Sequence, residues 1–511
     1  MYSVAFALLT RTAHFAGYLL GSNTSLYYWP VLACRKFEGA VQAILNGSPD
    51  SGPFVYASPL YRYLILPFYA TGIDRTGLFI FQSFLGVLTA WLIFRLALRA
   101  GASVFPALAA SFFWSLYAPA MFFELTILPV SLLSFLVIFF TLVQISGRTE
   151  SHRASLSGIT SGLISGLRPP FILMLTVPLW RWIREKAWKK IGTALLLLTL
   201  PLLFLSVQQK KLGGGFYPFP RTAGCNLVLG NSSESTGYGP PIPSLGLVET
   251  GNGDIHDVAA DITSELGLTS PAAADRYWMH IALSWIEKNP LAELRLLTVK
   301  LGGFFGSRPY DTYYELGRIS SFNPVFRFMF IPRMLISILF LLALVPFCLR
   351  GRNRAVILIP ITVALLSCIV FMHSERYSLP VFPLMMAAGA SGADILFRTI
   401  RKSPLKWLSA AAAGLIFLIP SLVYPVPSVP EEMFIGSLGV RAYFMEDYNL
   451  SLELFERAAL LAEEGDIIWV QGHTEAAKIS EALGYGERAE QHRTILRNWE
   501  HGRRETLRYI P

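Results

Sequence analysis

Four charged residues are the first candidates for chemistry, and three of them lie inside or at the ends of apolar runs, where an ionised group is costly. Glu38 belongs to a short polar stretch, and Glu124 lies inside an apolar run. Arg168 and Arg376 stand at the ends of apolar runs. A partly buried carboxylate can act as a base, and a guanidinium can hold a leaving phosphate. The alternatives are a solvated acid, an arginine that reaches the lipid interface, and an ordinary surface pair.

Apolar runs dominate the sequence and indicate its fold class. Charged residues make up 15% of the 511 residues, against roughly 25% in soluble domains, and hydrophobic residues make up 53%. This composition excludes a disordered or fibrous chain and argues against a soluble enzyme. We expect an all-α polytopic membrane protein with about eleven transmembrane helices, a mixed extracytoplasmic segment and a C-terminal helical-repeat domain. The runs cover about residues 4–21, 77–98, 103–118, 121–145, 155–168, 170–182, 191–208, 329–349, 355–371, 378–397 and 406–424.

Basic residues gather in connections between these runs. If the N-terminus is cytoplasmic, five short connections on that side carry much of the positive charge, as the positive-inside rule requires. The net charge of +9 therefore mainly records how the chain is threaded, and nucleic-acid binding loses its main support. The C-terminal domain is then extracytoplasmic. These basic residues are Arg95, Arg99, Arg148, Arg153, Arg181, Arg184, Lys186, Lys189, Lys190, Arg350, Arg352, Arg354, Arg398, Arg401, Lys402 and Lys406.

The sequence divides into four parts. They are an N-terminal transmembrane half, 1–208, with a first outer loop, 22–76; an extracytoplasmic segment, 209–328; the C-terminal transmembrane helices, 329–424; and a tetratricopeptide-like helical domain, 431–511. We predict helices at about 35–46, 254–266 and 271–288, and an interfacial or re-entrant stretch at 59–69. At most two repeats fit the tail, so we expect it to pack on the membrane domain or on a partner. The repeat offsets are occupied by Gly439, Ser451, Phe455 and Ala458, then by Ala477, Ala489 and Leu496.

The four cysteines do not form a disulfide framework. Cys348 and Cys368 lie in apolar runs, whereas Cys34 and Cys225 both fall outside and can pair, which we leave open. No HExxH motif, P-loop, dinucleotide-binding glycine motif or CxxC occurs in the sequence. Metalloprotease, ATPase and dinucleotide-enzyme functions are therefore unsupported.

Short motifs occur in a fixed order along residues 25–395, between the expected spans. They are Pro30-Val31-Leu32, Asn46-Gly47, Ala57-Ser58-Pro59-Leu60-Tyr61, Tyr117-Ala118-Pro119, Phe122-Phe123-Glu124-Leu125, Leu167-Arg168-Pro169-Pro170, Gly224-Cys225-Asn226, Gly230-Asn231, Tyr277-Trp278, Asn289-Pro290, Lys300 and Glu375-Arg376-Tyr377-Ser378-Leu379-Pro380. Taken together, this set resembles the bacterial polytopic glycosyltransferases of the GT-C class, those similar to protein mannosyltransferases and to the lipid A aminoarabinose transferase. A C-terminal repeat domain is also common in one bacterial branch of that class.

The resemblance implies transfer of a sugar from a polyprenyl-phosphate donor to a lipid, glycan or protein acceptor at the outer face of the bacterial cytoplasmic membrane. In that class an acidic residue of the first outer loop serves as the base or helps to hold a divalent cation, such as Mg or Mn. Relatives tend to carry Asp directly after Pro-Val-Leu, where this chain has Ala33, so Glu38 becomes the predicted catalytic residue. The predicted donor-phosphate ligands are Arg168, Arg376 and His373, and the other pocket candidates are Glu124, Tyr61, Asn226, Asn231, Lys300 and Arg308.

The replacement at Ala33 keeps a second hypothesis open. The chain can instead be a catalytically inactive scaffold with a GT-C-like membrane fold, which uses residues 431–511 to hold partners in envelope polysaccharide or protein-export assembly. A transporter is a weaker third hypothesis, because the sequence lacks the near-symmetric halves and the paired broken helices that transporters often show.

Overall fold

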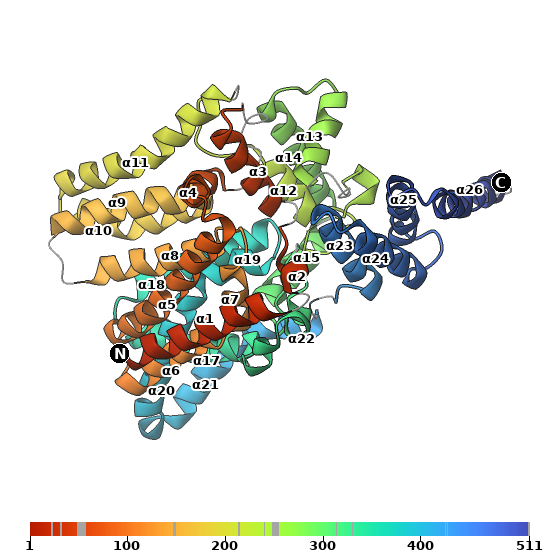
Figure 1. Ribbon diagram of the computed structural model, residues 1–511. Helices are drawn as coiled ribbons and strands as arrows, with labels where there is room; N and C mark the ends of the chain where they lie inside the picture. The colour runs from red at the N-terminus through yellow and green to blue at the C-terminus, as the bar shows by residue number, and fades with distance from the viewer. Residues whose placement is uncertain are drawn as a thin grey trace. The chain divides into compact units, whose positions relative to one another are not determined.

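The described chain is helical throughout. The computed structural model describes residues 1–511 except 22–23, 31–32, 49–57, 147–149, 213–214, 240, 248–254, 313, 330, 425, 427 and 509–511. Within these residues, helices are joined by loops, and β-pairing is limited to one isolated bridge between Ile242 and Leu247 (Figure 1). The all-α class is confirmed, and the extracytoplasmic segment expected to be mixed is helical apart from its loops and this bridge. The motif residues Val31, Leu32 and Ala57 and the connection residue Arg148 lie outside the described residues.

The chain forms two compact units. Unit 1 comprises Met1–Gly17 and Leu32–Val426, and unit 2 comprises Tyr18–Val31 and Pro427–Pro511. The second unit thus combines a short N-terminal segment with the C-terminal tail, a combination that the sequence did not reveal.

Four helical segments are long and apolar enough to cross a membrane. They are α5 (Asp74–Ala100), α11 (Trp188–Lys211), the segment Pro324–Arg350 that ends in α17 (Arg333–Arg350), and the segment Glu375–Thr399 that contains α19 (Glu375–Ser378) and α20 (Phe382–Thr399). A fifth candidate is the pair of α6 (Val104–Ser115) and α7 (Ala118–Glu124), which is bent by 54°. The expectation of about eleven spans is therefore wrong for the described residues, which provide four or five.

Short and interrupted helices account for the difference. A turn separates α7 from α8 (Val130–Ile145), and the run 170–182 divides between a 3-10 helix, Pro169–Leu175, and α10 (Thr176–Arg184). α18 (Arg354–Val370) and the segment Trp407–Val423, which includes most of α21 (Pro404–Leu415) and all of α22 (Ile419–Val423), are apolar but shorter than a span. α1 (Tyr2–Leu20) and α9 (Glu150–Leu167) are helices that do not meet the criteria for a span. Prolines and turns end helices inside runs that apolar composition alone would join.

The segments 22–76 and 209–328 contain the helices that the sequence predicts. α3 (Ala33–Leu45), α13 (Ile255–Glu265) and α14 (Pro271–Lys288) match the predicted ranges, and residues 59–69 form a 12-residue helix, α4 (Pro59–Ala70). Ser270 caps α14 by accepting a hydrogen bond from the backbone N–H of Ala273, and Asn289-Pro290 separates α14 from α15. The remaining outer helices are α2 (Thr24–Tyr28), α12 (Ala223–Gly230), α15 (Pro290–Phe305) and α16 (Ile319–Phe322).

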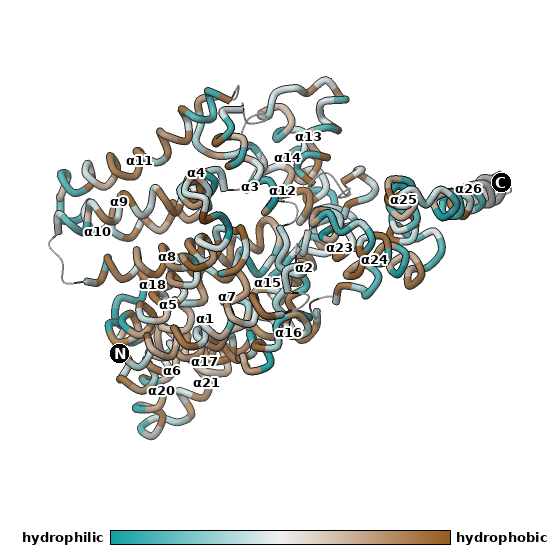
Figure 2. Tube along the Cα trace, viewed as in Figure 1, coloured by the Kyte–Doolittle hydropathy of each residue, from teal (hydrophilic) through white to brown (hydrophobic). Residues whose placement is uncertain are grey.

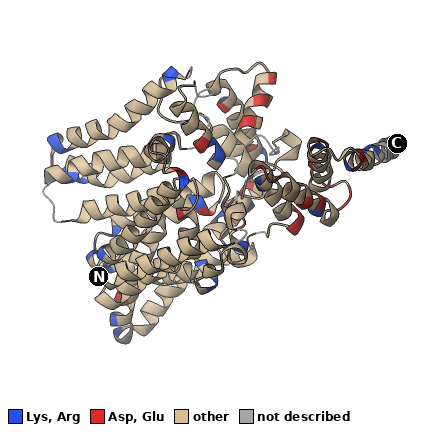
Figure 3. Ribbon diagram, viewed as in Figure 1, with Lys and Arg blue, Asp and Glu red and all other residues tan. Residues whose placement is uncertain are grey.

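Close helix packing in unit 1 depends on small residues. α9 and α11 lie side by side, and a Cβ atom on Gly162 would lie 2.6 Å from the Leu198 carbonyl oxygen and 2.9 Å from Pro201 (Figure 1). Most of the long helices in this unit are coloured as hydrophobic, and their charged residues gather near helix ends (Figures 2 and 3). The arrangement suits helices whose sides face lipid and whose ends face water.

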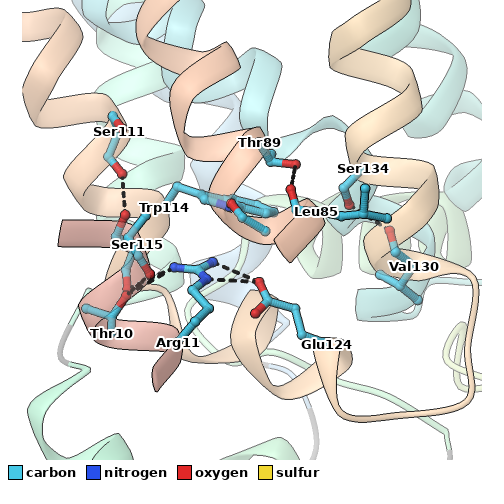
Figure 4. Close-up of polar contacts among 12 residues, drawn as sticks. Thr10, Arg11, Leu85, Thr89, Ser111, Trp114, Ser115, Glu124, Val130 and Ser134 are labelled. Carbon is cyan, nitrogen blue, oxygen red and sulfur yellow. Dashed lines mark hydrogen bonds and ion pairs between the residues drawn. The ribbon is translucent and has the colours of Figure 1, made fainter. Parts of the chain in front are cut away.

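A buried ion pair joins the first helix to the bent pair. The Arg11 guanidinium donates to Glu124 Oε1 from Nη2 at 2.8 Å and from Nε at 3.2 Å, and both side chains are at most 2% exposed (Figure 4). Arg11 also donates to Thr10 and to the Ser115 carbonyl oxygen. Glu124, one of the predicted pocket residues, pairs with Arg11.

Unit 2 is a succession of helices that pack on their neighbours along the chain. α23 (Glu431–Phe444), α24 (Tyr448–Leu461), α25 (Ile467–Ala482) and α26 (Gly486–Arg508) each contact the next helix. The predicted repeat positions meet: Ser451 donates to the Gly439 carbonyl oxygen at 2.9 Å, and a Cβ on Gly439 would lie 3.2 Å from the Phe455 ring. Within the same unit, Tyr27 of α2 lies against Phe434 of α23.

We predict that removing Arg11 alone destabilises the protein much more than removing Arg11 and Glu124 together. Arg11→Met alone leaves a buried carboxylate unpaired and should cost about 3–5 kcal/mol in the free energy of unfolding, whereas Arg11→Met with Glu124→Leu should recover most of it. Thermal unfolding of the detergent-solubilised chain measures both. Arg181→Gln, which breaks the more exposed Arg181–Glu185 pair, is the control and should change stability by less than about 1 kcal/mol. Equal losses in the single and double variants would contradict the prediction.

Candidate functional site

A fully buried ion pair fixes the loop that carries the predicted phosphate ligands. Glu375 begins α19, and its Oε2 accepts from Arg333 Nε at 2.7 Å, with both side chains 0% exposed. Its other oxygen accepts from the Tyr117 hydroxyl at 2.6 Å. Arg333 also donates to the carbonyl oxygens of Phe304 and Gly306 at 2.8 and 2.9 Å. Because every charged group has partners, the pair is a rigid joint between α7, α15, α17 and α19.

Asp311 holds the same loop from the other side. Its carboxylate accepts from the Ser374 hydroxyl at 2.8 Å and from Arg376 Nη1 at 3.3 Å, and the residue is buried. Arg376 is thereby oriented by a carboxylate from the segment 209–328. The sequence analysis did not assign a role to Asp311.

Arg168 and Arg376 meet around one tyrosine. The Arg168 guanidinium carbon lies 3.6 Å from the centre of the Tyr377 ring, and Arg376 Nη2 donates to the Tyr377 hydroxyl at 3.3 Å. Within the described part of the chain, Arg168 has no carboxylate partner. Two of the three predicted phosphate ligands are therefore brought together, with the Asp311 carboxylate bound to only one of them. Such a surplus of guanidinium charge can bind a phosphate through charge-assisted hydrogen bonds.

Arg168 lies beside a contact between two of the short motifs, residues 57–61 and 167–170. It follows the last residue of α9 and precedes the Pro169–Leu175 helix. The Ser58 hydroxyl, directly before α4, donates to the Leu167 carbonyl oxygen at 2.8 Å. The segment 22–76 therefore contacts the chain beside Arg168.

Lys300 and Asn231, both predicted pocket residues, are directly bonded. Lys300 lies on α15 with its side chain buried, and its Nζ donates to Asn231 Oδ1. The Asn231 amide donates in turn to the carbonyl oxygens of Leu227 and Val370, at 2.8 and 2.9 Å. Burial lowers the pKa of Lys300 from 10.5 to about 8, and the Glu293 carboxylate opposes that shift.

His373, the third predicted phosphate ligand, contacts a different set of residues from Arg376. Its backbone N–H donates to the Gly237 carbonyl oxygen at 2.9 Å, and its ring lies against Tyr238 and Gly303. Burial and the nearby Arg333 charge hold the pKa of His373 well below its usual value, so the imidazole is neutral. Neither ring nitrogen has a hydrogen-bond partner among the described residues.

Glu38, the predicted base, is bonded elsewhere. Its two oxygens accept from Arg75 Nε and Nη2, both at 2.6 Å, and one of them also accepts from the Tyr69 hydroxyl at 3.0 Å. Among the described residues its partners come from α4 and α5, and neither Arg168 nor Arg376 is one of them. Its catalytic role therefore remains a prediction.

The other pocket candidates occupy separate positions. The Tyr61 hydroxyl donates to Gln82, whose amide donates to the backbone of Glu124 and Thr126. Arg308 pairs with Glu315 at 2.8 Å. Asn226 bonds His256 at 3.2 Å rather than Lys300. These contacts give each residue a structural role outside the group around Tyr377.

The cysteines and carboxylates do not form the sites that sequence alone left open. No disulfide joins Cys34 and Cys225, so the disulfide alternative is wrong, and the Cys34 sulfur lies 3.5 Å from the Tyr314 hydroxyl. In the described ranges, no group of three or more His, Cys, Asp or Glu side chains is arranged to hold a metal ion.

Sequence reasoning missed Arg333, Tyr117 and Asp311. Arg333 carried a usable signal, because it is a charge inside the apolar run 329–349, where only a paired charge is tolerated. Tyr117 was quoted only as part of a motif. Asp311 is one of several acids in a long polar segment, and nothing local separates it from the others.

No family model, no curated protein and no solved structure matches this chain.

We predict that the stability difference between the wild type and Lys300→Met changes with pH, because Lys300 releases its proton at a lower pH in the folded chain than in the unfolded chain. The folded pKa is about 8 and the unfolded one 10.5, so the unfolded chain binds more protons between these values and stability rises with pH there. Relative to Lys300→Met, the wild type should therefore gain thermal stability between pH 8 and 10, with a constant difference below pH 7. Lys478→Met, at an exposed lysine, is the matched control and should show no such trend. A constant difference across the whole range would contradict the assignment.

Proposed function

We propose that this protein is a membrane glycosyltransferase that moves a sugar from a polyprenyl-phosphate donor to an acceptor at the extracytoplasmic face. One observation carries the proposal: the guanidinium groups of Arg168 and Arg376 meet at Tyr377, and of these two arginines only Arg376 is bonded to the Asp311 carboxylate in the described residues. Sugar transfer from such a donor releases a phosphate, whose growing charge must be stabilised in the transition state. A pair of guanidinium groups supplies that stabilisation.

The position of this group along the chain also supports a lipid-linked donor. Arg168 follows α9, and Arg376 belongs to the segment Glu375–Thr399, which is apolar and long enough to span a membrane. Cations at the ends of apolar helices meet a lipid phosphate at the interface while the polyprenyl tail stays in the hydrocarbon. A soluble nucleotide-sugar donor would not need this arrangement.

Two carboxylates are candidates for the base. Glu38 is the residue predicted from the first outer loop, but its oxygens are bonded to Arg75 and Tyr69. The Asp311 carboxylate is bonded to Arg376, one of the proposed phosphate ligands, and this position favours Asp311 as the base. The proposal therefore treats Asp311 as the alternative base, to be tested beside Glu38.

A divalent cation does not fit the described residues. Mg²⁺ and Mn²⁺ need several oxygen ligands, whereas Asp311 is already bonded to Arg376 and Ser374. We therefore assign the charge stabilisation to the arginines and derive no step through a metal.

The scaffold hypothesis has one observation in its favour. Glu38 forms a bidentate pair with Arg75, which is a typical structural arrangement, and Ala33 occupies the position where relatives carry Asp. A scaffold would bind partners through the helices of residues 431–511 and would show no turnover.

We predict that the chain turns over a radiolabelled polyprenyl-phosphate sugar and that both arginines matter. Arg376→Ala and Arg168→Ala should each lower kcat by about 10²–10³-fold, because each removes a donor to the leaving phosphate. Arg308→Ala, whose partner is Glu315, is the matched control and should keep near-normal activity. Glu38→Gln and Asp311→Asn tested in parallel identify the base, since only loss of the true base abolishes turnover.

Two results would count against the enzyme. Wild-type activity in both arginine variants would remove the site assignment. Absence of turnover by a folded wild type with any polyprenyl-phosphate sugar, together with capture of envelope proteins through residues 431–511, would favour the scaffold.

The proposed orientation makes a separate prediction about labelling in intact cells. In a cysteine-free background, Lys288→Cys should react with a membrane-impermeant thiol reagent, because α14 belongs to the extracytoplasmic segment, whereas Arg352→Cys should react only after permeabilisation. Both positions are exposed, so burial does not bias the comparison. The reverse pattern would place the site on the cytoplasmic side.

A further inference from the structure

Lys300 is a buried cation with too few partners. The side chain is 0% exposed, and an ammonium has three N–H donors. In the described part of the chain its only hydrogen-bond acceptor is Asn231 Oδ1, and it has no ion pair. Glu293, two turns earlier on α15, acts on it electrostatically without bonding to it, and one Glu293 oxygen is itself without a partner there. A buried charge of this kind is costly unless a further group completes its shell.

Other unsatisfied donors surround the same place. Gly237 lies between Lys300 and His373. A Cβ atom on Gly237 would lie 3.2 Å from Lys300 Cγ, and the Gly237 carbonyl oxygen accepts a hydrogen bond from the His373 backbone N–H. Gly303, one turn along α15 from Lys300, lies against the rings of His373 and Tyr238. Among the described residues the His373 ring nitrogens, the Tyr238 hydroxyl and the Ser232 hydroxyl all lack hydrogen-bond partners, and all three residues are at least nine-tenths buried.

This set is composed mainly of donors. Lys300 brings a positive charge, the hydroxyls of Tyr238 and Ser232 can each donate, and a neutral imidazole donates from one nitrogen. In the same part of the chain, no carboxylate is bonded to any of them. The lysine ammonium disfavours a metal cation, whereas an anion with several acceptor oxygens can accept hydrogen bonds from Lys300, Tyr238 and His373.

We propose that Lys300, Tyr238 and His373 form a second oxyanion site, which binds a phosphate group other than the one held by Arg168 and Arg376. The inference rests on the proposed function and extends it: the reaction then involves two phosphates rather than one. The second phosphate belongs either to a diphosphate-linked carrier or to a phosphorylated acceptor.

The loop between the two sites keeps them distinct. His373 faces Gly237, Tyr238 and Gly303, whereas Ser374 and Arg376 face Asp311, and Glu375 between them is held by Arg333. Each ligand therefore has its own set of donors on opposite sides of one fixed segment.

The test uses the full-length, detergent-solubilised chain and radiolabelled inorganic phosphate in equilibrium dialysis. The wild type should bind two phosphates per chain, and Lys300→Met and Arg376→Ala should each bind one. Tyr238→Phe, which removes a single hydroxyl, should weaken the second site by about 10-fold without loss of fold. Lys288→Met, an exposed lysine of the same segment, is the matched control and should bind two.

The outcomes separate this inference from the proposed function. If the wild type binds one phosphate and Lys300→Met retains it, or if Lys300→Met binds two, the second site is overturned, and the unsatisfied groups would then bind water only. If the wild type binds one phosphate and Lys300→Met loses it, the second site stands and the site at Arg168 and Arg376 is overturned. If Lys300→Met loses one phosphate and sugar transfer is never observed, the second phosphate site stands and only the proposed function fails. If Lys300→Met also weakens polyprenyl diphosphate about 10- to 100-fold while polyprenyl monophosphate binds as before, the carrier supplies the second phosphate. If both lipids bind as before, the acceptor supplies it.

Discussion

The ion pair between Arg333 and Glu375 is the interaction on which the candidate site depends. Both side chains are removed from water, a position that is stable only when every charged atom has a partner. Tyr117 and the carbonyl oxygens of Phe304 and Gly306 provide those partners, from helices far apart in the sequence. The pair therefore fixes the start of α19, and with it the direction of every side chain in the loop from His373 to Tyr377.

The loop and its neighbours hold more cationic groups than carboxylates can pair. Arg376 is held by Asp311, Arg168 lies over Tyr377 with no carboxylate of its own in the described ranges, and Lys300 is bonded only to Asn231 there. Buried cations without a carboxylate partner, as Arg168 and Lys300 are within the described residues, cost stability in the unliganded protein, which is typical of binding sites that await an anion. The same helices include segments apolar enough to cross a membrane, which agrees with an anion attached to lipid.

The sequence predicted the local features well and the long-range ones poorly. The amphipathic helix before Asn46, the helix that begins at Pro271 and the repeat-like contact of Gly439 with Phe455 follow from neighbouring residues, and all three occur. Arg168 and Arg376 were predicted separately, and the structure joins them at Tyr377. Three features were not predicted: the pairing of Arg11 with Glu124, the role of Asp311 and the number of spans. They depend on which helices pack together and on where each helix breaks, and apolar composition gives no information on either point.

The most direct measurement is a structure of the full chain, in a lipid nanodisc, with a non-transferable polyprenyl-phosphate analogue bound. The account predicts that the phosphate lies within hydrogen-bond distance of both Arg168 and Arg376, with the Arg333–Glu375 pair unchanged. A phosphate bound elsewhere while Arg168 still lies over Tyr377 would contradict it.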